Sequence, residues 1–235
     1  MHFNPIETEL TTAATDLLLV LAALYGVFRL RRYRPVDAWK VNLWIILLLS
    51  LATASLLAAV AHGLVLNAGV SGWLWRIIYL GLGLVVSSFV VASVYDLLGR
   101  RVAIRILPVI VVVALLFFLM VKIMGGSFWP FIVFEGLAMC FALAIYGYLG
   151  YRRERYSERW IAAGIGLSIV AAIIQAFRLG SFTLIWEFDH NSAYHLIQLP
   201  GLLFILLGLD KALGETKVTG DKMPVCLLDS QSDLS

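Results

Sequence analysis

Charged residues are scarce in this sequence of 235 residues: Asp, Glu, Lys and Arg make up 14% of the chain, whereas 61% is hydrophobic. A soluble domain typically has about 25% charged residues, and its surface could not hide this apolar excess from water. The composition excludes an ordinary soluble fold and predicts an integral, multi-pass membrane protein. The net charge of +3 is small and its basic residues form short clusters, so we expect no nucleic-acid partner.

Cysteine is also rare. Cys140 lies in an apolar run and Cys226 lies in the polar C-terminal segment, so we expect no disulfide bond and no cysteine-based metal site. Basic residues are missing before the first apolar stretch, where Glu7 and Glu9 stand instead. This pattern is unlike a secretory signal peptide, and we expect the first apolar stretch to be retained.

Long apolar runs are what the sequence has in abundance. A transmembrane helix needs about 20 such residues, and helices are the default because lipid cannot satisfy exposed backbone groups. The predicted fold class is all-α, with a seven-helix transmembrane domain over residues 1–213 and a loosely ordered cytoplasmic tail over 214–235. The predicted spans are 11–30, 41–66, 72–98, 102–124, 128–150, 158–180 and 192–213.

Lys and Arg alternate between the two sides of the predicted bundle. Clusters follow the first, third and fifth spans, and the other side carries Arg76, Lys122 and Arg178 near span ends. Because cytoplasmic loops are enriched in Lys and Arg, we expect the N-terminus outside and the C-terminus in the cytoplasm. The clustered residues are Arg29, Arg31, Arg32, Arg34, Lys40, Arg100, Arg101, Arg105, Arg152, Arg153, Arg155 and Arg159.

Polar and ionisable residues inside the spans are costly, so each is a functional-site hypothesis. Most of them fall in the outer half of the predicted bundle. In the inner half, Asp96 and Arg105 lie near span ends, where their side chains can reach the interface. The sequence therefore predicts one outer polar layer. Its members are Asp16, His62, Arg76, Glu135, Gln175, Arg178, Asp189, His190, His195 and Gln198.

Two of the four histidines lie in the stretch DHNSAYH, at the start of the last predicted span. Neutral imidazole is a common metal ligand, and a catalytic zinc site needs three protein ligands. His62, His190 and His195 could supply three. Residues five apart fall on different helix faces, so we expect His190 in the turn before the helix, with Asn191 or Ser192 as the N-cap. The alternative is that each histidine is an interfacial residue bonded to water.

The acids in the same layer have two interpretations. Glu135 or Asp16 could act as a general base or orient a metal ligand, and Asp16 could instead cap the first span. Arg76 and Arg178 could pair with these acids or anchor at lipid headgroups. Substrate-binding or supporting roles are predicted for Asp189, Gln198, Arg76, Gln175 and Arg178.

This arrangement resembles the CREST superfamily of seven-helix membrane hydrolases, which includes alkaline ceramidases and adiponectin-receptor-like proteins. In that family a histidine near the end of the second helix and a pair on the seventh bind zinc. His62 looks like the first of these ligands, and His190 with His195 looks like the pair. The expected topology, with the N-terminus outside, is similar to the ceramidase branch. The resemblance implies a divergent member with a zinc cofactor.

Three functional hypotheses follow. The first is a zinc-dependent intramembrane hydrolase acting on a lipid amide or ester bond, in which zinc activates water and membrane lipids are the partners. The second is a non-enzymatic membrane sensor, receptor or small transporter that uses the same polar layer as an ion or ligand site. The third is a haem protein with His62 and His195 as axial ligands. The sequence does not choose an oligomeric state.

Overall fold

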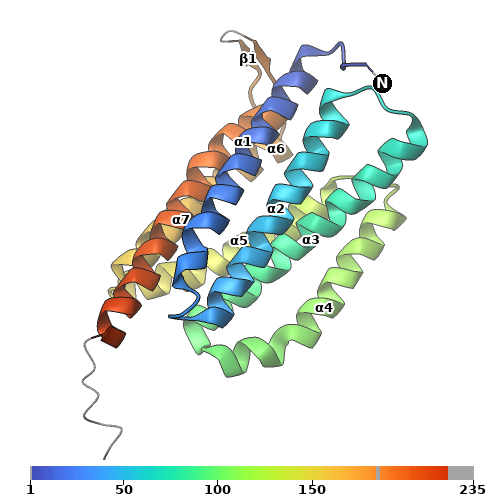
Figure 1. Ribbon diagram of the computed structural model, residues 1–235. Coiled ribbons are helices and arrows are strands. Elements are labelled where there is room, and N and C mark those ends of the chain that lie inside the picture. The colour runs from blue at the N-terminus through green and yellow to red at the C-terminus, as the bar shows by residue number, and fades with distance from the viewer. Residues whose placement is uncertain (1, 184–185, 222–235) are drawn as a thin grey trace, which may run out of the picture.

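The structure is a computed structural model that describes residues 2–183 and 186–221, with side chains described through Lys217. Seven helices in the described residues are long and apolar enough to cross a membrane (Figure 1). The prediction of an all-α, multi-pass membrane protein is confirmed at this level. The helices are α1 (Glu7–Leu30), α2 (Ala38–Gly63), α3 (Ala68–Leu98), α4 (Arg100–Ile123), α5 (Trp129–Gly147), α6 (Tyr156–Ala176) and α7 (His190–Asp221).

Six of these helices form a closed ring, and the remaining one, α4, lies outside it. Around the ring, α1 packs on α2, α2 on α3, α3 on α5, α5 on α6, α6 on α7, and α7 returns to α1. Helix α4 contacts α3 and, less extensively, α5. In Figure 1 it runs along the outside of the bundle and bends near its start, and it contains Pro108. The interior that could hold a ligand is therefore built by six helices.

Short polar signals set the helix boundaries. The Asp37 carboxylate accepts a hydrogen bond from the backbone N–H of Lys40 at 2.9 Å and caps α2. Asn67 caps α3 in the same way by accepting from Val70 at 2.9 Å. Gly99, with φ of 82°, makes the turn between α3 and α4. These local devices let consecutive helices follow each other with short connections.

Small residues bring α6 and α7 close together. A Cβ atom added at Gly164 would lie 2.5 Å from the carbonyl oxygen of Gly201, and one added at Gly208 would lie 2.7 Å from that of Ser157. Two helices in lipid gain packing energy when small residues allow their backbones to approach. These contacts fix the middle of α7 against α6, and the candidate site lies toward the N-terminal side of α7.

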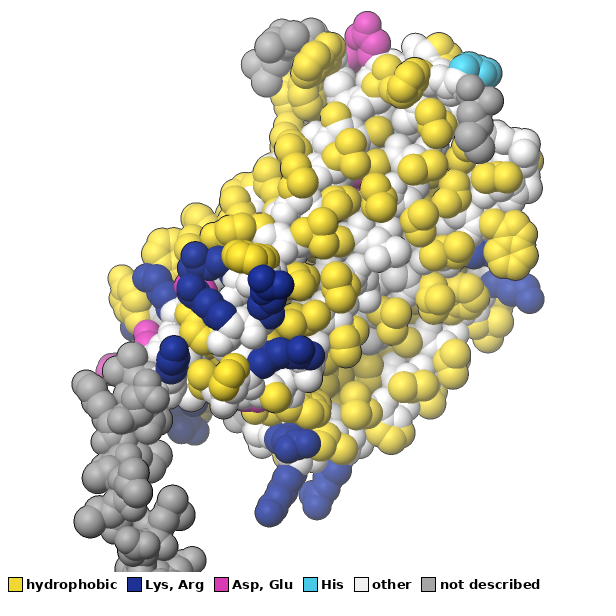
Figure 2. Space-filling model, in the orientation of Figure 1, with side chains coloured by type: hydrophobic (Ala, Val, Ile, Leu, Met, Phe, Trp, Pro, Cys, Tyr) yellow, Lys and Arg dark blue, Asp and Glu magenta, His cyan; other side chains and the backbone are white. Residues whose placement is uncertain are grey.

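The two ends of the bundle differ in their coverage. At the end that holds the N-terminus, the strands β1 (Phe182–Thr183) and β2 (Glu187–Phe188) form an antiparallel hairpin between α6 and α7. There, Phe3 forms an isolated β-bridge with Leu64. Most Lys and Arg side chains visible in Figure 2 gather around the opposite end, with a broad hydrophobic surface between. We call the end that holds the N-terminus and the hairpin the N-terminal end, and the end with most of the visible Lys and Arg side chains the far end.

Two predicted details of the last helix were wrong. His190 is the first residue of α7, rather than part of a preceding turn, and the cap is Asp189. The helix also continues to Asp221, past the predicted limit at 213. The remainder of the predicted tail, with Cys226, lies outside the described residues.

Candidate functional site

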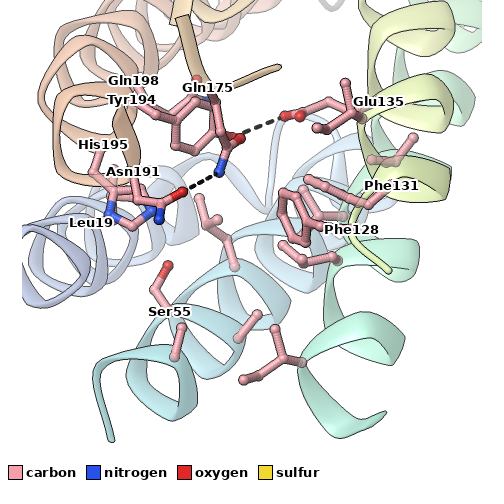
Figure 3. A pocket seen from close by; sticks show the side chains of 18 of the residues that line it. Leu19, Ser55, Phe128, Phe131, Glu135, Gln175, Asn191, Tyr194, His195 and Gln198 are labelled. Carbon is pink, nitrogen blue, oxygen red and sulfur yellow. Dashed lines mark hydrogen bonds between the residues drawn. The ribbon is translucent and has the colours of Figure 1, made fainter. Parts of the chain in front are cut away.

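A cavity of about 530 Å³ lies within the helical ring, a volume typical of small-molecule sites. Its lining comes from all six ring helices and from the segment before α5, and among the described residues α4 contributes none. Trp129 and Arg178 line the cavity and are also exposed, so it reaches the molecular surface at the N-terminal end. Figure 3 views this cavity from close by.

The cavity has a polar part and an apolar part. Along α2 its lining runs from His62 to Trp44, about 27 Å at 1.5 Å per residue. The polar residues gather at the N-terminal end, whereas Leu47, Leu51 and Phe89 line the deeper part. The cavity therefore changes from polar to hydrocarbon-like along the bundle axis.

Asp16 and His195 meet between α1 and α7. The Nε2 atom of His195 lies 3.6 Å from Asp16 Oδ1, and its Nδ1 atom lies 3.1 Å from the hydroxyl of Thr15. Asp16 is only 2% exposed. Helix α1 begins nine residues earlier, at Glu7, so Asp16 is no helix cap and the capping alternative is wrong.

Glu135 approaches the same region from α5. Its Oε1 atom accepts a hydrogen bond from the hydroxyl of Tyr194 at 3.2 Å (Figure 3). The ring of Tyr194 packs edge-on against that of His195, with centroids 5.3 Å apart. Tyr194 thus connects the two carboxylates: it bonds Glu135 directly, and the neighbouring His195 faces Asp16.

Two glutamines complete this polar part. The Gln175 amide donates to Asn191 Oδ1 at 3.3 Å, and Gln198 lies two turns further along α7 (Figure 3). Asp16 Oδ2, Glu135 Oε2, Gln175 Oε1 and Gln198 Oε1 are buried and have no hydrogen-bond partner within the described residues. We call these four residues the cavity acceptors. A buried acceptor left unpaired costs about 1–3 kcal/mol, so such a group needs a physical explanation.

Asp189 has a structural role at the start of α7. Its Oδ1 atom accepts from the backbone N–H groups of Asn191 at 3.1 Å and Ser192 at 3.0 Å, and Thr12 donates to the same oxygen at 3.3 Å. Burial acts to raise the pKa of the Asp189 carboxyl, but the hydrogen bonds from Ser192, together with His190 and Thr12, lower the pKa below its ordinary value. The predicted supporting role of Asp189 is thus that of a helix cap, and the residue does not line the cavity.

The three histidines line the same cavity, but each has its own partner. His62 Nδ1 lies 2.6 Å from Glu9 Oε2, and His190 Nδ1 lies 3.8 Å from Asp189 Oδ2. In the part of the chain that the structure describes, no group of three or more His, Cys, Asp and Glu residues could hold a metal ion. This arrangement does not fit the three-histidine zinc centre that the family resemblance implies.

The two arginines predicted for the site, Arg76 and Arg178, lie in different places. Arg178 lines the cavity at its exposed rim, whereas Arg76 is exposed, lies outside the cavity lining and packs its guanidinium 5.0 Å from the ring centre of Trp73. Across residues 2–183 and 186–217 neither arginine forms an ion pair with an acid. The expected pairing with Asp16 and Glu135 is therefore not found there.

The far end contains a second buried polar group, around Asp96, which the sequence analysis expected to reach the interface. Lys40 Nζ lies 2.6 Å from Asp96 Oδ1, with both side chains nearly buried, and Tyr146 donates to Asp96 Oδ2 at 2.9 Å. Asp96 thus points into the bundle rather than to the interface. We call Lys40, Asp96 and Tyr146 the far-end network. Polar groups are not confined to one half of the bundle.

Sequence reasoning also missed Tyr194, Asn191 and Thr15. A usable signal was present: Asn191, Tyr194, His195 and Gln198 recur three or four residues apart, which places them near one helix face. Thr12, Thr15 and Asp16 show the same spacing on α1. Neither pattern reveals which residue pairs with which, because that depends on how α1, α5 and α7 approach each other.

The chain belongs to a family of unknown function, DUF6962, whose model matches residues 11–213 and so covers α2 to α6 and most of α1 and α7. No curated protein and no solved structure matches the chain.

Proposed function

Because membership in this family assigns no activity, we propose from the geometry that the protein is a non-enzymatic membrane receptor or carrier that binds a single-chain amphiphile in the ring cavity. The observation that carries the proposal is the division of the cavity into four unpaired acceptors at one end and a hydrocarbon-like part beyond them. An amphiphile satisfies both parts at once, since its head group meets the acceptors and its chain covers apolar side chains.

The charge distribution supports an orientation for this site. The clustered Lys and Arg residues lie at the far end, whereas the polar part of the cavity lies at the N-terminal end. By the positive-inside rule we infer that the far end faces the cytoplasm and that the head group approaches from the opposite side. The predicted hydrolase and haem functions have no supporting arrangement among the described residues, and they stay predictions.

Filling the cavity tests the proposal. Ala58 lines the cavity on α2, whereas Leu56 on the same helix is 48% exposed and faces away. The purified protein in phosphatidylcholine nanodiscs is titrated with tritiated dodecanol, and binding to empty nanodiscs is subtracted. We expect saturable binding by the wild type, loss of at least tenfold in affinity for Ala58→Phe, and no change for Leu56→Phe.

Two results would contradict the proposal. One is the absence of saturable binding above the empty nanodiscs. The other is equal binding by the wild type and by an Ala58→Phe variant whose thermal unfolding matches that of the wild type, because a phenyl ring in the cavity removes space that the chain of the ligand needs.

A further inference from the structure

The polar part of the cavity contains several buried acceptors that have no partner among the described residues. Asp16 and Glu135 are 2% and 5% exposed, and each has one carboxylate oxygen with no partner in the described part of the chain. The amide oxygens of Gln175 and Gln198 are unpaired in the same sense. All four residues line one cavity. A complementary head group must therefore bring several hydrogen-bond donors.

His195 lies beside Asp16. Its Nε2 atom faces Asp16 Oδ1 at 3.6 Å, and its Nδ1 atom lies 3.1 Å from the hydroxyl of Thr15. The other carboxylate oxygen of Asp16, Oδ2, is the one without a partner in the described residues.

We propose that the cavity acceptors bind the primary ammonium group of a long-chain amine; this inference rests on the proposed function. An ammonium group has three donors and no acceptor, which suits a polar part whose unpaired buried groups are acceptors. A hydroxyl head group would bring one donor and further lone pairs. A carboxylate or phosphate head group would place a second negative charge beside Asp16 and Glu135.

The walls favour the same head group. Trp75, Tyr79 and Tyr194 line the same cavity, and aromatic ring faces attract cations. The positive charge of Arg178 lies at the exposed rim rather than beside the buried acids. The buried part of the site therefore presents Asp16 and Glu135 with no cationic side chain among the described residues that line it.

Three probes with the same chain and different head groups test this inference. Dodecylamine, dodecanol and dodecanoate compete at pH 7 with tritiated dodecanol for the protein in phosphatidylcholine nanodiscs. We expect dodecylamine to bind at least tenfold more tightly than dodecanol, and dodecanoate to bind most weakly. Hydrogen bonds to a charged group contribute about 1.5–3 kcal/mol, or roughly 10- to 150-fold in affinity.

Conservative variants locate the effect. Asp16→Asn and Glu135→Gln should each reduce the preference for dodecylamine over dodecanol at least fivefold. The control is Glu187→Gln, which removes an exposed acid at the same end that does not line the cavity. Its preference for the amine should equal that of the wild type.

The outcomes separate this inference from the proposed function. Saturable dodecanol binding with no preference for the amine overturns the ammonium site alone, as does an unchanged preference in both conservative variants. Failure of dodecanol and dodecylamine alike to bind overturns the proposed function as well. Titration with Zn²⁺ alone is the last arm, and stoichiometric zinc binding that His195→Ala removes would replace the amine by a metal ion.

Discussion

The two ends of the bundle both bury charged residues, but they treat them differently. In the far-end network, Lys40 and Tyr146 both contact Asp96, so each of its carboxylate oxygens has a partner. At the N-terminal end, Asp16 and Glu135 each keep an oxygen that nothing in the described residues satisfies. A satisfied buried network holds helices together, whereas an unsatisfied one costs stability and needs an explanation, which the proposed ligand supplies. Whether a buried carboxylate has partners for both oxygens, rather than its burial or its charge, distinguishes a structural residue from a candidate site residue.

The largest predicted effect is at the far end. Replacing Lys40 by Met leaves the buried Asp96 carboxylate without its cation, and removing one partner of a buried ion pair costs about 3–5 kcal/mol. We expect a correspondingly lower free energy of unfolding in a denaturation titration. The control is Asp16→Asn at the N-terminal end, which should stay within about 1 kcal/mol of the wild type. Equal losses for both variants would remove the distinction between the two ends.

A smaller effect is expected for Glu135. Glu135→Met leaves the buried Tyr194 hydroxyl without its acceptor, and such an orphaned group costs about 1–3 kcal/mol. The double variant Glu135→Met/Tyr194→Phe removes both partners and should recover most of this loss, while the preference for dodecylamine stays reduced. Denaturation and the competition assay on the same samples check both parts. A double variant as unstable as the single one would mean that Glu135 is a structural residue.

The helix cap at the N-terminal end should behave like the far-end network on a smaller scale. Asp189→Ala should cost about 1 kcal/mol at pH 7, the usual effect of losing an N-cap. Because the folded-state pKa of Asp189 is lowered, its contribution is full above the unfolded-state value of about 3.9 and is lost as the pH falls through the folded-state pKa. The wild-type advantage over Asp189→Ala should therefore shrink in acid. Asp189→Asn keeps an acceptor at the cap, and a loss for it as large as for alanine would contradict the capping role.

The smallest effect is expected at the surface of the far end. Arg32 Nη2 lies 2.7 Å from Asp210 Oδ1, but the Arg32 side chain is 49% exposed. Exposed ion pairs contribute about 0–1 kcal/mol. Arg32→Ala should lower the free energy of unfolding by less than 1 kcal/mol, and added salt should reduce the difference. A loss comparable to that of Lys40→Met would mean that exposure does not decide the value of an ion pair here.

The helices could be predicted from sequence because hydrophobicity and length decide where a chain crosses lipid. All seven expected spans correspond to observed helices, and their ends differ most at the C-terminal end of α7, which continues to Asp221. The cavity lining was also anticipated in part, since an ionisable residue in a span must face the interior. Asp16, Glu135, Gln175 and Gln198 do line one cavity.

The partners within that lining could not be predicted. Lys40 and Asp96 are far apart in the sequence, and each lies near the end of its own helix, where a side chain can equally reach the interface. Only the approach of α2 to α3 makes them a buried pair. The same holds for the histidines, because a one-dimensional spacing contains no information on whether α2 and α7 bring two rings within reach of one ion.

The position of α4 outside the ring has a practical consequence. Helix α4 contacts the ring through α3 and α5, and none of its described residues lines the cavity. A fluorophore attached to its exposed face, for example at Leu115, would therefore sample the bilayer and leave the cavity unaltered. Such a label offers an internal reference for a second dye at the exposed rim of the cavity, which can report ligand entry.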